Sequence, residues 1–199
     1  MVIWSWPTDP GHHPLQRLRE HACRADTDAW YLGWLINRMD RRDKVGLLGF
    51  SFGTRVVTGA MHLLGGGQLC GKQLADEASQ QAGGSAVRPT IRAALLAAAE
   101  NSDWLEPGAP NGQAIPRADQ MLLLNNGCDS ALRLYPHLDR CDRADALGYV
   151  GLWGDSGEKV QQFDVCCMVG KRHEALSYFY NDSLIARMRP YMFLDSDQR

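Results

Sequence analysis

The chain has 199 residues, of which 45% are apolar and 22% charged, and its formal net charge at pH 7 is −2. This size and composition predict one soluble globular domain, residues 1–199, with a substantial core. The weak net charge gives no electrostatic reason to expect a nucleic acid or an anionic membrane surface as a partner. No segment approaches the roughly 20 apolar residues of a transmembrane span, and the N-terminal apolar run is too short and lacks the basic lead of a signal peptide.

The elements predicted in chain order alternate between strand and helix. A strand over Val2–Trp6 precedes a helix over residues 14–39, in which Pro14 suits the first turn. The next elements are a strand over Lys44–Phe50, a helix over Thr54–Leu64, strands over Ile91–Ala99, Gln120–Asn126 and Val160–Gly170, and a closing helix over His173–Met188. This order indicates an α/β fold, a mostly parallel sheet of about five strands with helices on both faces.

Six cysteines are present, and none of them forms a C-x-x-C pair, which argues against a zinc site or a thioredoxin-like site. The chain is too large to need a disulfide scaffold. Cys166 and Cys167 lie in "VCCMVG", an apolar run typical of a buried strand, where a free thiol is simply a small apolar side chain. These features predict reduced cysteines and a cytoplasmic location.

The stretch "GFSFG" around Ser51 matches the strand–turn–helix pattern of a nucleophile elbow. "VGLLGF" supplies the incoming strand and "TRVVTGAMHLL" the outgoing helix. Glycine is needed at Gly49 and Gly53 because a side chain there would collide with the neighbouring helix or strand. The backbone N–H of Phe52 would stand at the helix N-terminus, where it can stabilise an oxyanion. A chance G-x-S-x-G is the alternative, and the flanking elements favour the elbow.

A serine nucleophile needs a base, and the base needs an orienting acid. In the elbow fold these follow in the order serine, acid, histidine, each just past the end of a later strand. Asp129 follows the strand that ends at Asn126, and His173 follows the strand that ends at Gly170. Asp103 in "ENSDW" is the alternative acid, because some hydrolases take the acid from the preceding strand. The alternatives without a catalytic role are that Asp129 is an exposed aspartate in a turn and that His173 is a surface histidine.

The other five histidines fit the base less well by position: His12, His13, His21, His62 and His137. His12 and His13 are adjacent in an early loop, and no further metal ligands lie at a useful spacing from them. No metal is therefore expected, and no cofactor is expected either, since the chemistry of a serine, its base and its acid needs only these residues and the oxyanion donors. Trp104 and Leu105 could line an acyl pocket, and a surface loop with one tucked tryptophan is the alternative.

From about Val2 to Arg189, the chain resembles the α/β-hydrolase superfamily of serine esterases and lipases. The resemblance is carried by "GFSFG", "NNGCD", "GKRH" and "VIWSWPTD". It implies an acyl-enzyme mechanism on a small-molecule or lipid-like acyl substrate. Ser51 would attack an ester carbonyl, His173 would take and return the proton, and Asp129 would hold the imidazole.

By this resemblance, the chain is expected to begin where the fourth strand of that family begins, and the loop that supplies the family's second oxyanion donor is expected to have no counterpart. Loss of one such donor costs around 10²–10³ in rate. Two functions are therefore expected: a serine hydrolase, or a catalytically weak hydrolase-like binding domain that uses the same cleft. A longer natural product in which Met1 is internal and a genuinely short hydrolase are both open.

Overall fold

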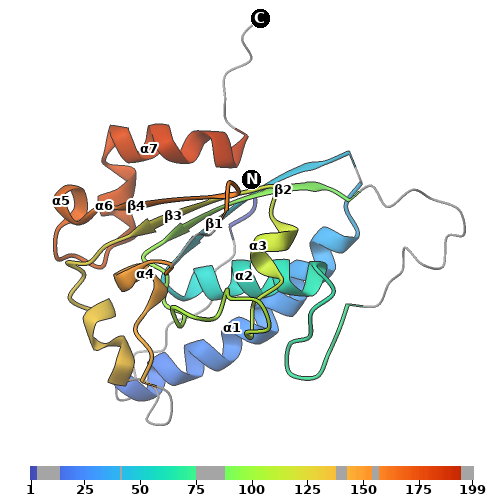
Figure 1. The fold of residues 1–199 in the computed structure, drawn as a ribbon, viewed down its shortest axis with the longest axis horizontal. Helices are drawn as coiled ribbons and strands as arrows, with labels where there is room; N and C mark the ends of the chain where they lie inside the picture. Colours follow the sequence, from blue (N-terminus) through green and yellow to red (C-terminus); the bar gives the residue numbers. More distant parts are fainter. Residues whose placement is uncertain (4–13, 41, 75–87, 138–142, 154–156, 194–199) are drawn as a thin grey trace, which may run out of the picture.

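A four-stranded parallel sheet forms the centre of the protein, with the strands in the order β1-β2-β3-β4. The computed structural model describes residues 1–3, 14–40, 42–74, 88–137, 143–153 and 157–193 (Figure 1). The strands are β1 (Lys44–Phe50), β2 (Thr90–Leu96), β3 (Gln120–Asn125) and β4 (Val160–Asp164). The predicted α/β class is confirmed, although the described sheet has four strands rather than five.

Helices cover both faces of this sheet (Figure 1). On one face lie the two long helices, α1 (Pro14–Asn37) and α2 (Phe52–Leu64), with the short α3 (Ala114–Arg117) beside α2. On the other face lie α7 (Asp182–Met188) and the 3₁₀ turn η3 (Arg189–Met192). The remaining short elements are η2 (Leu132–His137), α4 (Leu147–Val150), α5 (Cys166–Val169) and α6 (Ala175–Phe179).

The sheet is the middle layer of three because its strands are apolar on both faces. Along a strand, successive side chains point to opposite faces. On β2, Leu95 joins the core that contains Met61 of α2, whereas Leu96 joins the core that contains Leu184 of α7. Such double burial is typical of parallel sheets.

Two predicted elements differ from the observed ones: one strand ends early and one helix is interrupted. The strand predicted over Val160–Gly170 ends at Asp164, where the side-chain Oδ1 accepts the N–H of Cys166 (2.8 Å) and starts a helical turn. The helix predicted over His173–Met188 is two helices, α6 and α7. Asn181 lies between the two helices. The side-chain oxygen of Asn181 accepts the N–H groups of Ser183 and Leu184, which makes Asn181 the N-cap of α7.

The ends of two other predicted elements also differ. β2 stops at Leu96 because Ala97 takes a positive φ of 45°, which turns the chain out of the sheet. Residues 1–3 are exposed and belong to no strand, and the rest of the strand predicted over Val2–Trp6 lies outside the described residues. Within the described ranges, no helix has the length and apolar character needed to span a bilayer.

Candidate active site

The candidate site lies at the edge of the sheet where the four parallel strands end. The register aligns these ends, pairing Phe50 with Leu96 and Leu96 with Leu124. The segments that follow β1, β3 and β4 therefore meet at one place, and they carry Ser51, Asp129 and His173. In open α/β sheets this edge is where ligands bind.

Ser51 sits in a backbone conformation that side-chain-bearing residues rarely adopt, with φ 53° and ψ −125°. Four hydrogen bonds hold it there. Its N–H donates to the carbonyl of Leu96 (3.0 Å), and its carbonyl accepts from the N–H groups of Thr54 (3.1 Å) and Ala99 (3.2 Å). The Oγ1 of Thr54 also donates to that carbonyl (2.6 Å). The strained turn is thus fixed by the end of β2, by the segment just after it and by the first turn of α2.

Glycine at position 49 is required by the close approach of β1 to α2. A Cβ on Gly49 would lie 2.7 Å from the Cα of Thr54 and 2.8 Å from the carbonyl oxygen of Gly53. Phe52 is the first residue of α2, so its N–H has no acceptor within the helix. This N–H stands directly after Ser51 and is available to an oxygen beside the serine.

Ser51, His173 and Asp129 form a continuous hydrogen-bonded series, called the Ser–His–Asp series below. The Nε2 of His173 lies 2.9 Å from the Oγ of Ser51, and its Nδ1 lies 2.8 Å from the Oδ2 of Asp129. Asp129 is fully buried, and its Oδ1 accepts the N–H groups of Ala131 (2.9 Å) and Leu132 (3.0 Å). An ionised carboxylate only accepts hydrogen bonds, which assigns the imidazole proton to Nδ1 and leaves Nε2 to accept from the serine hydroxyl.

Two aromatic side chains, Phe50 and Tyr178, pack in series next to His173. The ring centroids of Phe50 and His173 are 5.0 Å apart. The ring of the buried Tyr178 packs edge-on against that of Phe50, with 6.0 Å between the centroids. Burial raises the pKa of the Tyr178 phenol well above its usual range, and the negative charge of Asp129 raises it further. The phenol therefore stays neutral, and no second negative charge forms beside the carboxylate.

The alternative acid, Asp103, is exposed, and the carboxylate that contacts His173 is that of Asp129. Trp104 and Leu105 lie on the α2 side of the molecule. The guanidinium of Arg55 lies 4.3 Å from the centre of the Trp104 ring, and Leu105 is buried in the core cluster that contains Met61. Leu105 is therefore part of the core and not the wall of an open acyl pocket.

The other histidines lie apart from the series in the described part of the chain. Around His62, the backbone N–H groups of Gln68 (3.0 Å) and Gln113 (3.2 Å) point at the two ring nitrogens. His137 is exposed at the end of η2. His12 and His13, and the side chain of His21, lie outside the described residues.

Sequence reasoning missed a buried carboxyl group, Glu100, in the loop after β2. It accepts hydrogen bonds from the Oγ1 of Thr58 (2.6 Å) and the Nδ2 of Asn111 (3.3 Å). Burial raises its pKa to about 7, and these two bonds and the charge of Arg55 oppose the shift. Its second oxygen has no hydrogen-bond partner among the described residues. The available signal was a charged residue placed directly after the apolar run Ile91–Ala99.

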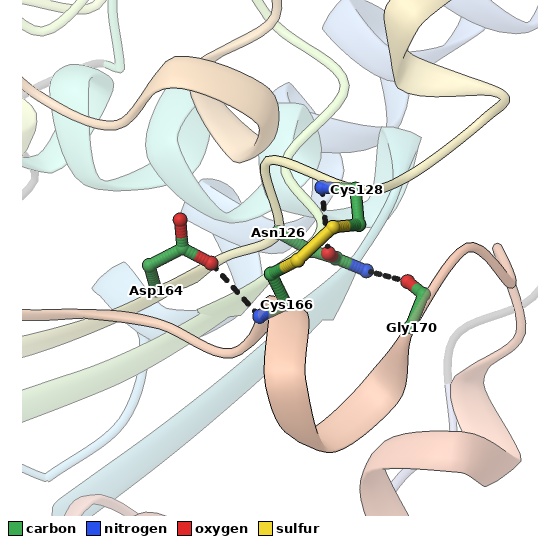
Figure 2. The surroundings of a disulfide bond; sticks show 5 residues. All are labelled: Asn126, Cys128, Asp164, Cys166 and Gly170. Atoms are coloured by element: carbon green, nitrogen blue, oxygen red, sulfur yellow. Dashed lines mark hydrogen bonds between the residues drawn. A yellow bond between two sulfur atoms is a disulfide. The ribbon is translucent and has the colours of Figure 1, made fainter.

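Sequence reasoning also missed a disulfide between Cys128 and Cys166, which corrects the prediction of reduced cysteines (Figure 2). Cys166 is not in a buried strand. It starts α5, where its Cα lies 5.2 Å from that of Cys128, within the range that a disulfide spans. Cys70 and Cys167 are free and exposed.

Chemically, the Ser–His–Asp series can remove a proton from the serine hydroxyl and hold the resulting imidazolium against a carboxylate. The N–H of Phe52 is a donor for an oxyanion that forms beside the serine. Comparisons with protein-family models, curated proteins and solved structures found no match to this chain.

Proposed function

We propose that this protein is a serine hydrolase that cleaves carboxylic esters or related acyl compounds through an acyl-enzyme. The observation that carries the proposal is the Ser–His–Asp series, with separations of 2.9 Å and 2.8 Å, starting from a serine held at φ 53°. A serine on a strained strand-to-helix turn is the arrangement that exposes a nucleophile. The α/β sheet and the order of the three residues along the chain add support from the α/β-hydrolase resemblance.

In the proposed reaction, the Oγ of Ser51 attacks the acyl carbon while the Nε2 of His173 takes the hydroxyl proton. The negative charge that develops on the carbonyl oxygen is stabilised by the N–H of Phe52 at the start of α2. The imidazolium then gives its proton to the leaving alcohol, and Asp129 keeps the ring oriented and stabilises its charge. Water, activated by the same histidine, releases the acid from Ser51.

The proposed substrate is a small-molecule or lipid-like acyl compound. The triad chemistry requires only the nucleophile, the base, the acid and the oxyanion donors, so the proposal includes no metal and no cofactor. Initial rates on p-nitrophenyl esters of acetate, butyrate and octanoate separate a short-chain esterase from an enzyme that prefers lipid-like chains.

The cytoplasmic location stays a prediction, and the Cys128–Cys166 disulfide weighs against it. Disulfides persist in oxidising compartments and are rare in the cytosol, where thiols are kept reduced. Thiol counting on protein alkylated at the moment of cell lysis shows which state the cell maintains.

Labelling with a fluorophosphonate probe tests the proposed function, because the probe phosphonylates only an activated serine. We expect the wild-type protein to be labelled, and Ser51→Ala to abolish labelling and ester hydrolysis. We expect His173→Gln to lower both rates by on the order of 10⁴–10⁶.

Ser183→Ala is the matched control, because Ser183 is an exposed serine on α7. It should be labelled like the wild type. A folded wild-type protein that takes up no probe contradicts the hydrolase proposal and favours a binding domain that uses the same cleft without turnover.

A further inference from the structure

The Cys128–Cys166 disulfide joins the two segments that carry the acid and the base. Cys128 directly precedes Asp129 in the loop after β3, and Cys166 begins α5, on the segment that leads to His173. The bond thus connects positions 38 residues apart in the sequence at the place where these segments approach each other (Figure 2).

The same two segments are also connected by the buried side chain of Asn126. Its Oδ1 accepts the N–H of Cys128 (3.0 Å) within the loop after β3 that carries Asp129, called the acid loop below. Its Nδ2 donates to the carbonyl of Gly170 (2.8 Å) on the segment after β4 that leads to His173, called the histidine segment (Figure 2). Ser130 adds a hydrogen bond from its Oγ to the carbonyl of Lys171 (2.9 Å). Neutral hydrogen bonds of this kind contribute about 0.5–1.5 kcal/mol each. The disulfide differs from them because it connects the two segments covalently.

The position of the acid depends on the position of its loop. The Oδ1 of Asp129 is bound to N–H groups of that same loop, at Ala131 and Leu132, so the carboxylate moves with the loop. Its Oδ2 must remain 2.8 Å from the Nδ1 of His173, which belongs to the other segment. A shift of the two segments relative to each other therefore acts directly on the contact that orients the base.

The disulfide is reachable by a small reductant because both cysteines are half-buried rather than fully enclosed. A dithiol supplies two electrons and two protons. One of its thiolates attacks a disulfide sulfur and forms a mixed disulfide, and its second thiolate displaces the protein sulfur. The products are two cysteine thiols and the oxidised, cyclic dithiol.

We propose that the Cys128–Cys166 disulfide is a positioning element of the Ser–His–Asp series, and that its oxidation state sets the rate of acyl transfer. The inference rests on the proposed hydrolase function. In the oxidised protein the acid loop and the histidine segment are held in register. In the reduced protein the two segments keep hydrogen bonds, including those of Asn126 and Ser130 and the Asp129–His173 contact itself, but lose the covalent connection. The acid–base contact then loosens.

The test compares oxidised protein with protein reduced by dithiothreitol, using the rate of fluorophosphonate labelling and the kcat and KM for a p-nitrophenyl ester. We expect reduction to lower kcat and the labelling rate at least about tenfold, because a 1 Å misplacement of reacting groups costs on the order of 10²-fold. We expect KM to change by less than about twofold, and reoxidation to restore the rate.

Two cysteine variants serve as matched controls. Cys70→Ser combined with Cys167→Ser removes the exposed free thiols of the described residues and keeps the disulfide, so it should respond to dithiothreitol like the wild type. Cys128→Ser combined with Cys166→Ser should be slow from the outset and insensitive to the reductant. If this second variant does not fold, the comparison of oxidised and reduced wild-type protein still decides the question.

The outcomes separate this inference from the proposed function. Equal rates in the oxidised and the reduced protein, with the two released thiols counted, overturn the positioning role and leave the hydrolase in place. An oxidised protein that is never labelled overturns the hydrolase itself. A loss of rate accompanied by loss of the far-ultraviolet circular dichroism signal also overturns the positioning role, because the bond would then hold the whole fold.

Discussion

Ser51 is held in place by several neighbours. A residue with a side chain in an unfavourable backbone region costs about 1–3 kcal/mol and persists only when its surroundings fix it. Here the fixing groups belong to β2, the segment just after it and α2, and β1 approaches α2 so closely only because Gly49 has no side chain. The conformation of the serine is thus a property of a tightly packed corner and not of the serine alone.

Gly49→Ala should therefore damage the corner. Its Cβ would lie 2.7 Å from a backbone atom of Thr54, which is unable to move aside without shifting α2. We expect the free energy of unfolding, measured in urea, to fall by about 1–3 kcal/mol, and the fluorophosphonate labelling rate to fall with it. Gly33→Ala is the control, since its Cβ would meet the movable Cδ1 of Leu74 at 3.3 Å. Equal losses in both variants would contradict the packing argument.

At the scale of elements, α7 illustrates how a short helix is fixed at one end and along one face. The side-chain oxygen of Asn181 accepts the N–H groups of Ser183 (3.1 Å) and Leu184 (3.3 Å), and the Leu184 N–H also donates to the backbone carbonyl of Asn181 (3.0 Å). Leu184 and Met188 on the same helix are buried in the core beneath it. The cap and the buried face together explain why seven residues form a stable element.

Asn181→Ala should remove the cap and lower the free energy of unfolding by about 1 kcal/mol. Asn181→Asp keeps an acceptor at the same place and adds a negative charge at the helix N-terminus, so we expect it to stay close to the wild type. Urea unfolding of the three proteins measures the difference. A loss in the aspartate variant as large as that in the alanine variant would show that the side-chain acceptor is not the source of the stabilisation.

Hydrophobic patterning was sufficient to predict β1, β3, α1 and α2 close to their observed bounds, because these elements are long or strongly apolar. It failed at "VCCMVG", where an apolar run begins a helical turn, because the deciding interaction is a side-chain hydrogen bond from Cys166 N–H to Asp164. It failed again at Asn181, whose capping role depends on where α7 packs.

The three residues of the candidate site could be predicted because chain order and strand ends are readable in a sequence. Asp129 and His173 were chosen by position, and the structure brings His173 to Ser51 and Asp129 to His173. The disulfide and the clustering of Glu100 with Thr58 and Asn111 were not predicted. They depend on which distant segments meet in space, and a single sequence does not encode this in a readable pattern.

At the scale of the whole molecule, Glu100 connects the stability of the fold to pH. Its pKa is about 7 in the folded protein, against an ordinary value of 4.5, and desolvation by burial is the main cause. Between these two values the folded protein keeps a proton that the unfolded chain has released. The free energy of unfolding contributed by this group therefore falls as pH rises through that window.

The expected loss from Glu100 is about 3 kcal/mol between pH 4.5 and 7, the free-energy equivalent of the pKa difference. Glu100→Gln stays neutral at every pH, so the wild type should lose stability relative to this variant as pH rises. Urea unfolding at several pH values measures the difference. Glu106→Gln, which changes an exposed carboxyl group, should leave the wild-type pH dependence intact. Parallel curves for the wild type and Glu100→Gln would contradict the prediction.

The sheet order β1-β2-β3-β4 means that neighbours in space are also successive in the chain. During synthesis, which releases the N-terminal part first, each strand can add to the edge left by the one before it. The turn that carries Ser51 can therefore form while the segments bearing Asp129 and His173 are still inside the ribosome. For the proposed hydrolase, a nascent chain at that point holds Ser51 without His173, so reactivity would arise only once β4 and the segment after it have emerged.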